Sequence, residues 1–168
     1  AIVTGDITAT TVNIVGGNAA AEDNLLVAKG NLTGNVVMAD NAGTTTLTLF
    51  GTAAQTLTGT ITAAEVQEAT VNVTNVSGAE VKFTGAVGTA SKRLLDLTTS
   101  DGAKTTFNAA IATKNLTIGN DSAGLVTTFE AAGNIVGTDG GTAGALTLAG
   151  GEIRLGTGIA SGDVMFDV

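Results

Sequence analysis

Leu57-Thr58-Gly59-Thr60-Ile61 is one version of a five-residue phrase that recurs seven times along this chain of 168 residues. Successive versions begin 29, 25, 26, 24, 22 and 26 residues apart. They start at Val3, Leu32, Leu57, Phe83, Phe107, Phe129 and Leu155. Repeats of this length are typical of proteins in which each unit buries its apolar face against its neighbours. We therefore interpret residues 1–168 as one repeat array with no internal domain boundary.

The phrase predicts a β-strand, because large apolar residues alternate with polar ones and Gly or Ala fills the middle position. A second alternating triplet follows each phrase, as in Leu47-Thr48-Leu49 and Val71-Asn72-Val73. The remaining triplets start at Val12, Leu95, Leu116, Leu146 and Val164. Glycine-containing turns such as Ser77-Gly78 and Gly150-Gly151 precede the next phrase. Each unit thus holds at least two short strands joined by corners.

Short strands closed by glycine corners predict an all-β fold, a parallel β-solenoid of about seven rungs. The first residue of every phrase should then stack in one inward column. A second inward column should hold Ile7, Val36, Ile61, Val87, Ile111 and Ile159. Residues 18–29 and 63–69 are the best helix candidates, each short enough to be one turn at a corner. Antiparallel β-sandwich domains are the alternative, because short strands at this spacing fit them also.

The composition restricts the function. Hydrophobic residues make up 43% of the chain and aromatic residues 3%, and Pro, Cys, His, Trp and Tyr are absent. Disulfides and Cys or His metal sites are therefore excluded. The net charge of −8 and the pI near 4.2 disfavour nucleic acids and anionic membranes as partners. No apolar run is long enough to predict membrane insertion.

The repeats resemble the passenger repeats of bacterial surface autotransporters. Segments such as Gly30-Asn31-Leu32-Thr33-Gly34-Asn35-Val36 and Phe83-Thr84-Gly85-Ala86-Val87 carry this resemblance, which extends over the whole chain. They are most similar to the rickettsial outer-membrane protein B group, which forms surface layers and contributes to adhesion. The resemblance implies a right-handed parallel β-solenoid on a bacterial surface. A chain that begins at Ala1, without a leader of its own, also fits a secreted product or an excised piece.

Catalytic chemistry is disfavoured, and we expect no enzyme activity. The chain has no His base and no Cys nucleophile, and none of its serines lies in a nucleophile-elbow phrase. The carboxylates of Asp6, Asp96 and Asp101 fall on different strands or corners. A polysaccharide lyase or hydrolase built on a solenoid is therefore the least favoured function.

Calcium is the only cofactor that the sequence suggests. Asp101, Asp121 and Asp139 lie in predicted corners, and Ca²⁺ accepts carboxylate and backbone oxygens together. The glycine-rich calcium repeat and the EF-hand pattern are both absent, and Asp and Asn favour turns without any metal. Turn chemistry is accordingly the favoured interpretation of these three aspartates.

Ice binding through paired threonine columns is also disfavoured. The two outward columns of the phrase carry Thr together in only one copy, at Thr58 and Thr60. Strand propensity explains the abundance of threonine better.

These observations predict a non-enzymatic extracellular structural component, such as a surface layer, a fibre or an autotransporter passenger. The first phrase begins at Val3 and the last triplet ends at Phe166, which leaves little sequence for polar caps. We expect a homo-oligomer or polymer joined through terminal strands near residues 1–7 and 163–168. The alternative is an adhesin or glycan-binding module whose corner loops recognise a host surface or a glycan.

Overall fold

The computed structural model describes residues 1–16, 24–39, 44–75, 78–99, 104–119, 126–131, 134–137, 145–149, 152–155 and 164–166. These residues form strands, bends and turns in an all-β fold. Because the described residues include no helix, they also include none that could cross a membrane.

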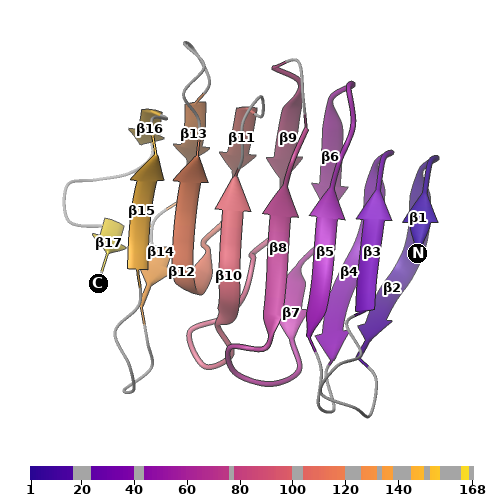
Figure 1. Ribbon diagram of the computed structural model, residues 1–168, viewed down its shortest axis with the longest axis horizontal. Helices are drawn as coiled ribbons and strands as arrows, with labels where there is room; N and C mark the ends of the chain where they lie inside the picture. The colour runs from indigo at the N-terminus through magenta and orange to yellow at the C-terminus, as the bar shows by residue number, and fades with distance from the viewer. Residues whose placement is uncertain are drawn as a thin grey trace.

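Two parallel β-sheets face each other (Figure 1). The nine-stranded sheet contains β1 (Ile2–Val3), β3 (Asn24–Ala28), β5 (Thr45–Leu49), β8 (Ala69–Val73), β10 (Leu94–Thr99), β12 (Ala112–Gly119), β14 (Asn134–Val136), β15 (Ala145–Ala149) and β17 (Val164–Phe166). The eight-stranded sheet contains β2 (Ile7–Val15), β4 (Leu32–Ala39), β6 (Gln55–Thr58), β7 (Ile61–Ala63), β9 (Glu80–Phe83), β11 (Lys104–Phe107), β13 (Val126–Phe129) and β16 (Glu152–Leu155). Every pairing between these strands is parallel.

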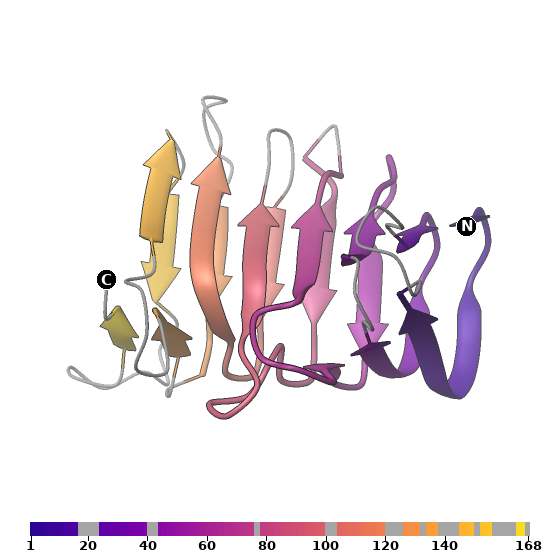
Figure 2. The same cartoon turned by 60° about the horizontal axis from the view of Figure 1, so that its bottom comes forward.

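The chain coils through the two sheets as a right-handed parallel β-solenoid. It runs up the near sheet and down the far one in Figure 1 while it advances from right to left, and Figure 2 shows the same path from below. The predicted solenoid is confirmed, and the antiparallel sandwich is excluded by the parallel pairings. The rung count differs slightly from about seven, because the strand orders run through eight strands in one sheet and seven in the other. Two further strands lie outside these orders: β15 pairs with β12, and β7 pairs with β4.

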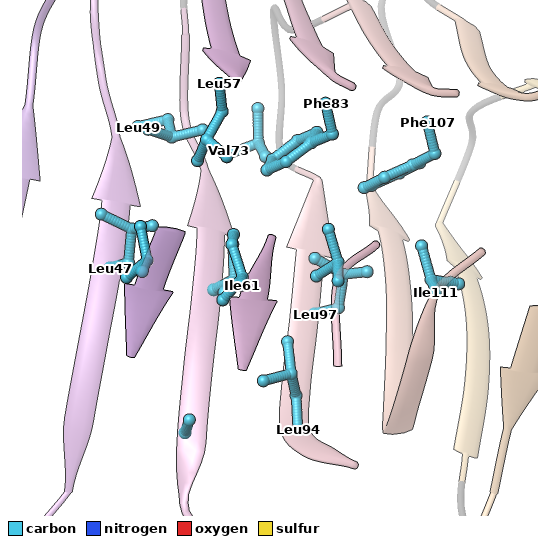
Figure 3. Packing of buried hydrophobic residues seen from close by; sticks show 14 of the residues in the cluster. Leu47, Leu49, Leu57, Ile61, Val73, Phe83, Leu94, Leu97, Phe107 and Ile111 are labelled. Atoms are coloured by element: carbon cyan, nitrogen blue, oxygen red, sulfur yellow. The ribbon is translucent and has the colours of Figure 1, made fainter. Parts of the chain in front are cut away.

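The core is a set of apolar columns that run along the solenoid axis (Figure 3). One column follows the first residue of the phrase through Leu32, Leu57, Phe83, Phe107 and Phe129, all buried. Its three phenylalanine rings stack, with centroids 4.8 Å and 5.3 Å apart. A second column contains Val36, Ile61, Val87 and Ile111. The facing sheet contributes Leu47, Val71, Leu97 and Leu116. The predicted stacking is thus confirmed for the described interior copies.

The first copy of the phrase is out of the predicted register. Val3 pairs with Ala28 in the nine-stranded sheet, while Ile7 pairs with Leu32 and Val12 with Val36. Ile7 therefore takes the place predicted for Val3, and Val12 the place predicted for Ile7. A register shift between Thr8 and Thr11 adds a residue to the first rung, which a count along the sequence does not reveal. The position predicted for Ile159 lies outside the described residues.

Three triplets also lie elsewhere than predicted. The triplet at Val12 belongs to β2, in the same sheet as the phrases. In β10, Leu97 and not Leu95 pairs with Val71, because Leu94 and Leu97 are the leucines that point inward. The triplet at Val164 pairs with β14 and does not continue the Leu146 position.

Neither helix candidate is a helix within the described residues. Residues 24–28 of the first form β3, which lies between β1 and β5, so tertiary pairing overrides the Ala-rich local preference. Residues 17–23 lie outside the described part. The second candidate, residues 63–69, is a corner between β7 and β8, where Gln67 adopts a φ of 61°.

The middle glycine of the phrase is required by close backbone contact between rungs. Gly59 has a φ of 123°, and a side chain there would clash with the carbonyl oxygen of Gly34 on the preceding rung. A side chain on Gly85 would clash in the same way with the carbonyl of Gly59. These glycines let the eight-stranded sheet bend between its two inward columns.

Replacing the central ring of the phenylalanine stack tests the column directly. Phe107→Ala should lower the free energy of unfolding by about 3–5 kcal/mol, because it opens a cavity between two stacked rings. Phe50→Ala is the matched control. Phe50 is 38% exposed, and the Lys29 ammonium lies over its ring in a cation–π contact. The Phe50→Ala variant should therefore lose less than about 1 kcal/mol of unfolding free energy. Equal losses in denaturant unfolding of the two variants would contradict the stacked core.

Candidate functional site

The acidic residues do not converge on a catalytic or metal centre in the described part of the chain. No group of three or more His, Cys, Asp and Glu side chains that could hold a metal occurs there. Asp101, Asp121 and Asp139, the calcium candidates, lie outside the described residues.

The other two aspartates considered for catalysis connect neighbouring rungs. Asp6 lies in an exposed corner, where its Oδ1 accepts the backbone N–H of Asn31 at 2.7 Å. Asp96 accepts the side-chain amide of Asn115 at 2.8 Å, on the outward face of the nine-stranded sheet. Asp6 lies in the corner between β1 and β2 on the first rung, whereas Asp96 lies in β10 several rungs away, so the fold does not bring them together as an acid–base pair.

The most unusual surface is the open edge of the first rung. β1 and β2 are the terminal strands of the two sheets, and both lie at the N-terminal end of the solenoid (Figure 1). Within the described residues, each has a parallel neighbour on one side only. We call β1 and β2 together the first-rung edge.

The first-rung edge exposes two apolar side chains on its outward face, and two of its inward side chains are less buried than their partners one rung further. Ile2 is 68% exposed and Val15 is 53% exposed. Ile7 and Val12 are half-buried, while their register partners Leu32 and Val36 are 1% and 0% exposed. A missing rung therefore leaves Ile7 and Val12 half-buried, although Ile14 of the same strand is 7% exposed.

The sequence of β2 offers no protection against pairing with another strand. Its nine residues, Ile-Thr-Ala-Thr-Thr-Val-Asn-Ile-Val, include no charge, no Pro and no Gly, and seven are β-branched. Natural edge strands are usually short, charged, bulged or interrupted by Pro. A long uncharged strand of high β-propensity is instead a template for strand addition. The register shift after Thr8 is the only such device here, and residues 11–15 pair regularly beyond it.

The outer side of β2 presents backbone donors that β4 does not use. The N–H of Gly16 donates to the Ala39 carbonyl at 2.6 Å, towards β4. Because successive residues of a strand point their N–H groups to opposite sides, the N–H groups of Asn13 and Val15 point away from β4. Asn13 is also exposed and points outward from the core.

The sequence predicted a terminal strand near residues 1–7, and the structure enlarges that edge. Most of the first-rung edge is β2, whose alternating apolar and polar residues fit the repeat pattern and do not by themselves indicate an edge strand. The absence of any charge over residues 7–15 was the signal that could have identified it.

No protein-family model matches the chain, and comparisons with curated proteins and with solved structures give no match either. Function is therefore inferred from the fold, its edge and its corners.

Calcium removal tests the predicted role of the corner aspartates. The fold should keep its melting temperature in excess EDTA, because stacked apolar columns and backbone ladders supply the stability. Thermal unfolding followed by circular dichroism, with and without chelator, measures this. A fall of more than about 5 °C would show that calcium, at Asp101, Asp121 or Asp139, contributes more than about 1 kcal/mol to the fold.

Proposed function

We propose that the protein is a non-enzymatic structural component that assembles end to end, with the first-rung edge of one molecule covered by the last rung of another. Such a component would form a fibre, a surface layer or the shaft of an autotransporter passenger. The observation that carries this proposal is the uncharged, one-sided strand β2, whose inward side chains Ile7 and Val12 are only half-buried.

The register of the ladder supports a head-to-tail contact. β16 is the last strand of the eight-stranded order, and there Leu155 pairs with Phe129 and Arg154 with Thr128. Continuing the same ladder into a second copy places Leu155 opposite Ile7 and Arg154 opposite Asp6. The ladder of parallel pairings would then run on from one copy into the next, with apolar residues in register at Leu155 and Ile7. Head-to-tail contacts of this kind do not close and therefore propagate.

Composition and repeat style support an extracellular location at a cell surface. The chain has no cysteine, a net charge of −8 and polar threonine-rich strands, and its repeats resemble surface passengers. An extended rigid rod also suits a role in which length and repetition matter more than a cleft.

A proline in the outer edge of β2 tests the assembly. Asn13→Pro removes an N–H that points away from β4, so the bonds between β2 and β4 are kept, while an added strand loses a donor and meets the ring. The concentration needed for assembly should rise at least about tenfold. Asn13→Thr keeps the donor and is the matched control. Sedimentation velocity over a concentration series, with circular dichroism to check folding, measures the effect.

Two outcomes would contradict the proposal. One is a wild-type protein that stays monomeric at high concentration with its β2 amides protected from hydrogen exchange. The other is assembly that is equally strong in the folded Asn13→Pro and Asn13→Thr variants.

A further inference from the structure

Gln55 carries a buried amide at the upper corner of the coil. It begins β6, points into the core, and is 3% exposed. Its Nε2 donates to two carbonyl oxygens of the preceding rung, Ala28 at 3.0 Å and Gly30 at 2.8 Å. Two acceptors on one side fix the orientation of the amide, because a flipped amide would set its oxygen against both carbonyls. Its Oε1 is buried and has no hydrogen-bond partner in the part of the chain that the structure describes.

Asn75 presents a second such oxygen from the next rung. It follows β8, is 0% exposed, and donates its Nδ2 to the Ala53 carbonyl at 3.1 Å. That bond fixes the orientation of this amide as well. Its Oδ1 is also buried and has no hydrogen-bond partner among the described residues.

Both oxygens border the same small space beside Gly51. A methyl group placed on Gly51 would lie 3.5 Å from the Oε1 of Gln55 and 3.7 Å from the Oδ1 of Asn75. The carbonyl oxygen of Lys29 would lie 3.4 Å from the same methyl. Lys29 follows β3, Gln55 begins β6 after the corner from β5, and Asn75 follows β8, so these oxygens come from successive rungs. We call this space the Gly51 site.

Two buried, unpaired acceptors beside one space are costly. Each loses its interaction with water on folding, and nothing in the protein replaces it. Native proteins satisfy nearly all buried polar atoms, often with an internal water that makes two to four hydrogen bonds. A space of methyl size is close to what one small guest needs.

We propose that the Gly51 site binds a small, positively polarised guest that bridges Gln55 Oε1 and Asn75 Oδ1, with the Lys29 carbonyl as a third contact. The guest is either one water molecule, whose two hydrogens match the two amide oxygens, or a bare monovalent cation held by the three oxygens. The described site contains no carboxylate, so it suits neutral-oxygen coordination of Na⁺ or K⁺ better than Ca²⁺.

The Gly51→Ala substitution tests whether a guest is bound, because it should raise the melting temperature if the site is empty and lower it if the site is occupied. The φ of Gly51 lies outside the left-handed region and its neighbours leave room for a methyl, so Gly51→Ala on its own should stabilise by restricting the unfolded chain. If a guest is bound, the methyl displaces it and leaves both amide oxygens unpaired. The melting temperature should then fall by roughly 4–10 °C.

Gly119→Ala is the matched control, because a methyl there would meet only the Thr99 carbonyl, at 3.5 Å, among the described residues. It should leave the melting temperature unchanged or slightly higher.

A double-mutant cycle shows whether Asn75 shares the guest. In an Asn75→Ala background one of the two oxygens is already gone, so the further fall caused by Gly51→Ala should shrink by about half. Additive effects would mean that Gly51→Ala acts through something other than the bridge, and would overturn the proposal.

Three salts at equal ionic strength distinguish the two guests. A bound cation makes the difference between wild type and Gly51→Ala larger in sodium or potassium chloride than in tetramethylammonium chloride. A bound water gives the same difference in all three salts. A Gly51→Ala protein as stable as the wild type, or more stable, in every salt would overturn the proposal.

Discussion

Parallel stacking of equivalent positions is the constraint on which the rest of the structure depends. Each apolar side chain is covered by the same position on the rung before and the rung after, as the phenylalanine stack of Phe83, Phe107 and Phe129 shows. A single rung cannot bury such a side chain, and neither sheet can do so alone. Full burial therefore depends on the neighbouring rungs of the same column together with the facing sheet. The narrow interior also explains why the chain manages with 3% aromatic residues.

The same constraint makes a terminal rung chemically different from an interior one. Ile7 and Val12 have the same kind of side chain and the same inward direction as Leu32 and Val36, yet they remain half-buried because one neighbour is missing. The hydrogen-bond ladder is incomplete at the same place. Half-buried apolar side chains and unused backbone donors therefore coincide at β2 without any specialised residue, and the proposed assembly through that edge would complete the interior pattern.

The sequence was informative where the repeat is regular and misleading where it is not. Spacing placed Leu32 through Phe129 in one column correctly, since these copies differ little in length. It failed at Val3, because Val3 lies in β1 opposite Ala28 while Ile7 begins the strand that pairs with Leu32. It failed at the second column because the bulge after Thr8 puts Val12 opposite Val36. It failed at β3, because the Ala-rich segment before it has helical propensity while residues 24–28 pair on both sides. The first-rung edge was only partly foreseen, since a strand becomes an edge through topology and not through its own residues.

Polar side chains inside the coil gather where the two sheets meet at the upper corner, and this placement fixes the register of the rungs. Gln55, Val81, Thr105 and Thr127 occupy one inward column, and Thr99 Oγ1 lies 3.2 Å from Thr127 Oγ1 across the core. Apolar columns of Leu, Ile and Val are nearly interchangeable, so they do not by themselves prevent a slip of two residues in the register between neighbouring rungs. Such a slip would remove Gln55 from the Ala28 and Gly30 carbonyls and leave a buried amide unpaired. The corner amides thus favour one register between neighbouring rungs, while the apolar columns supply most of the stability.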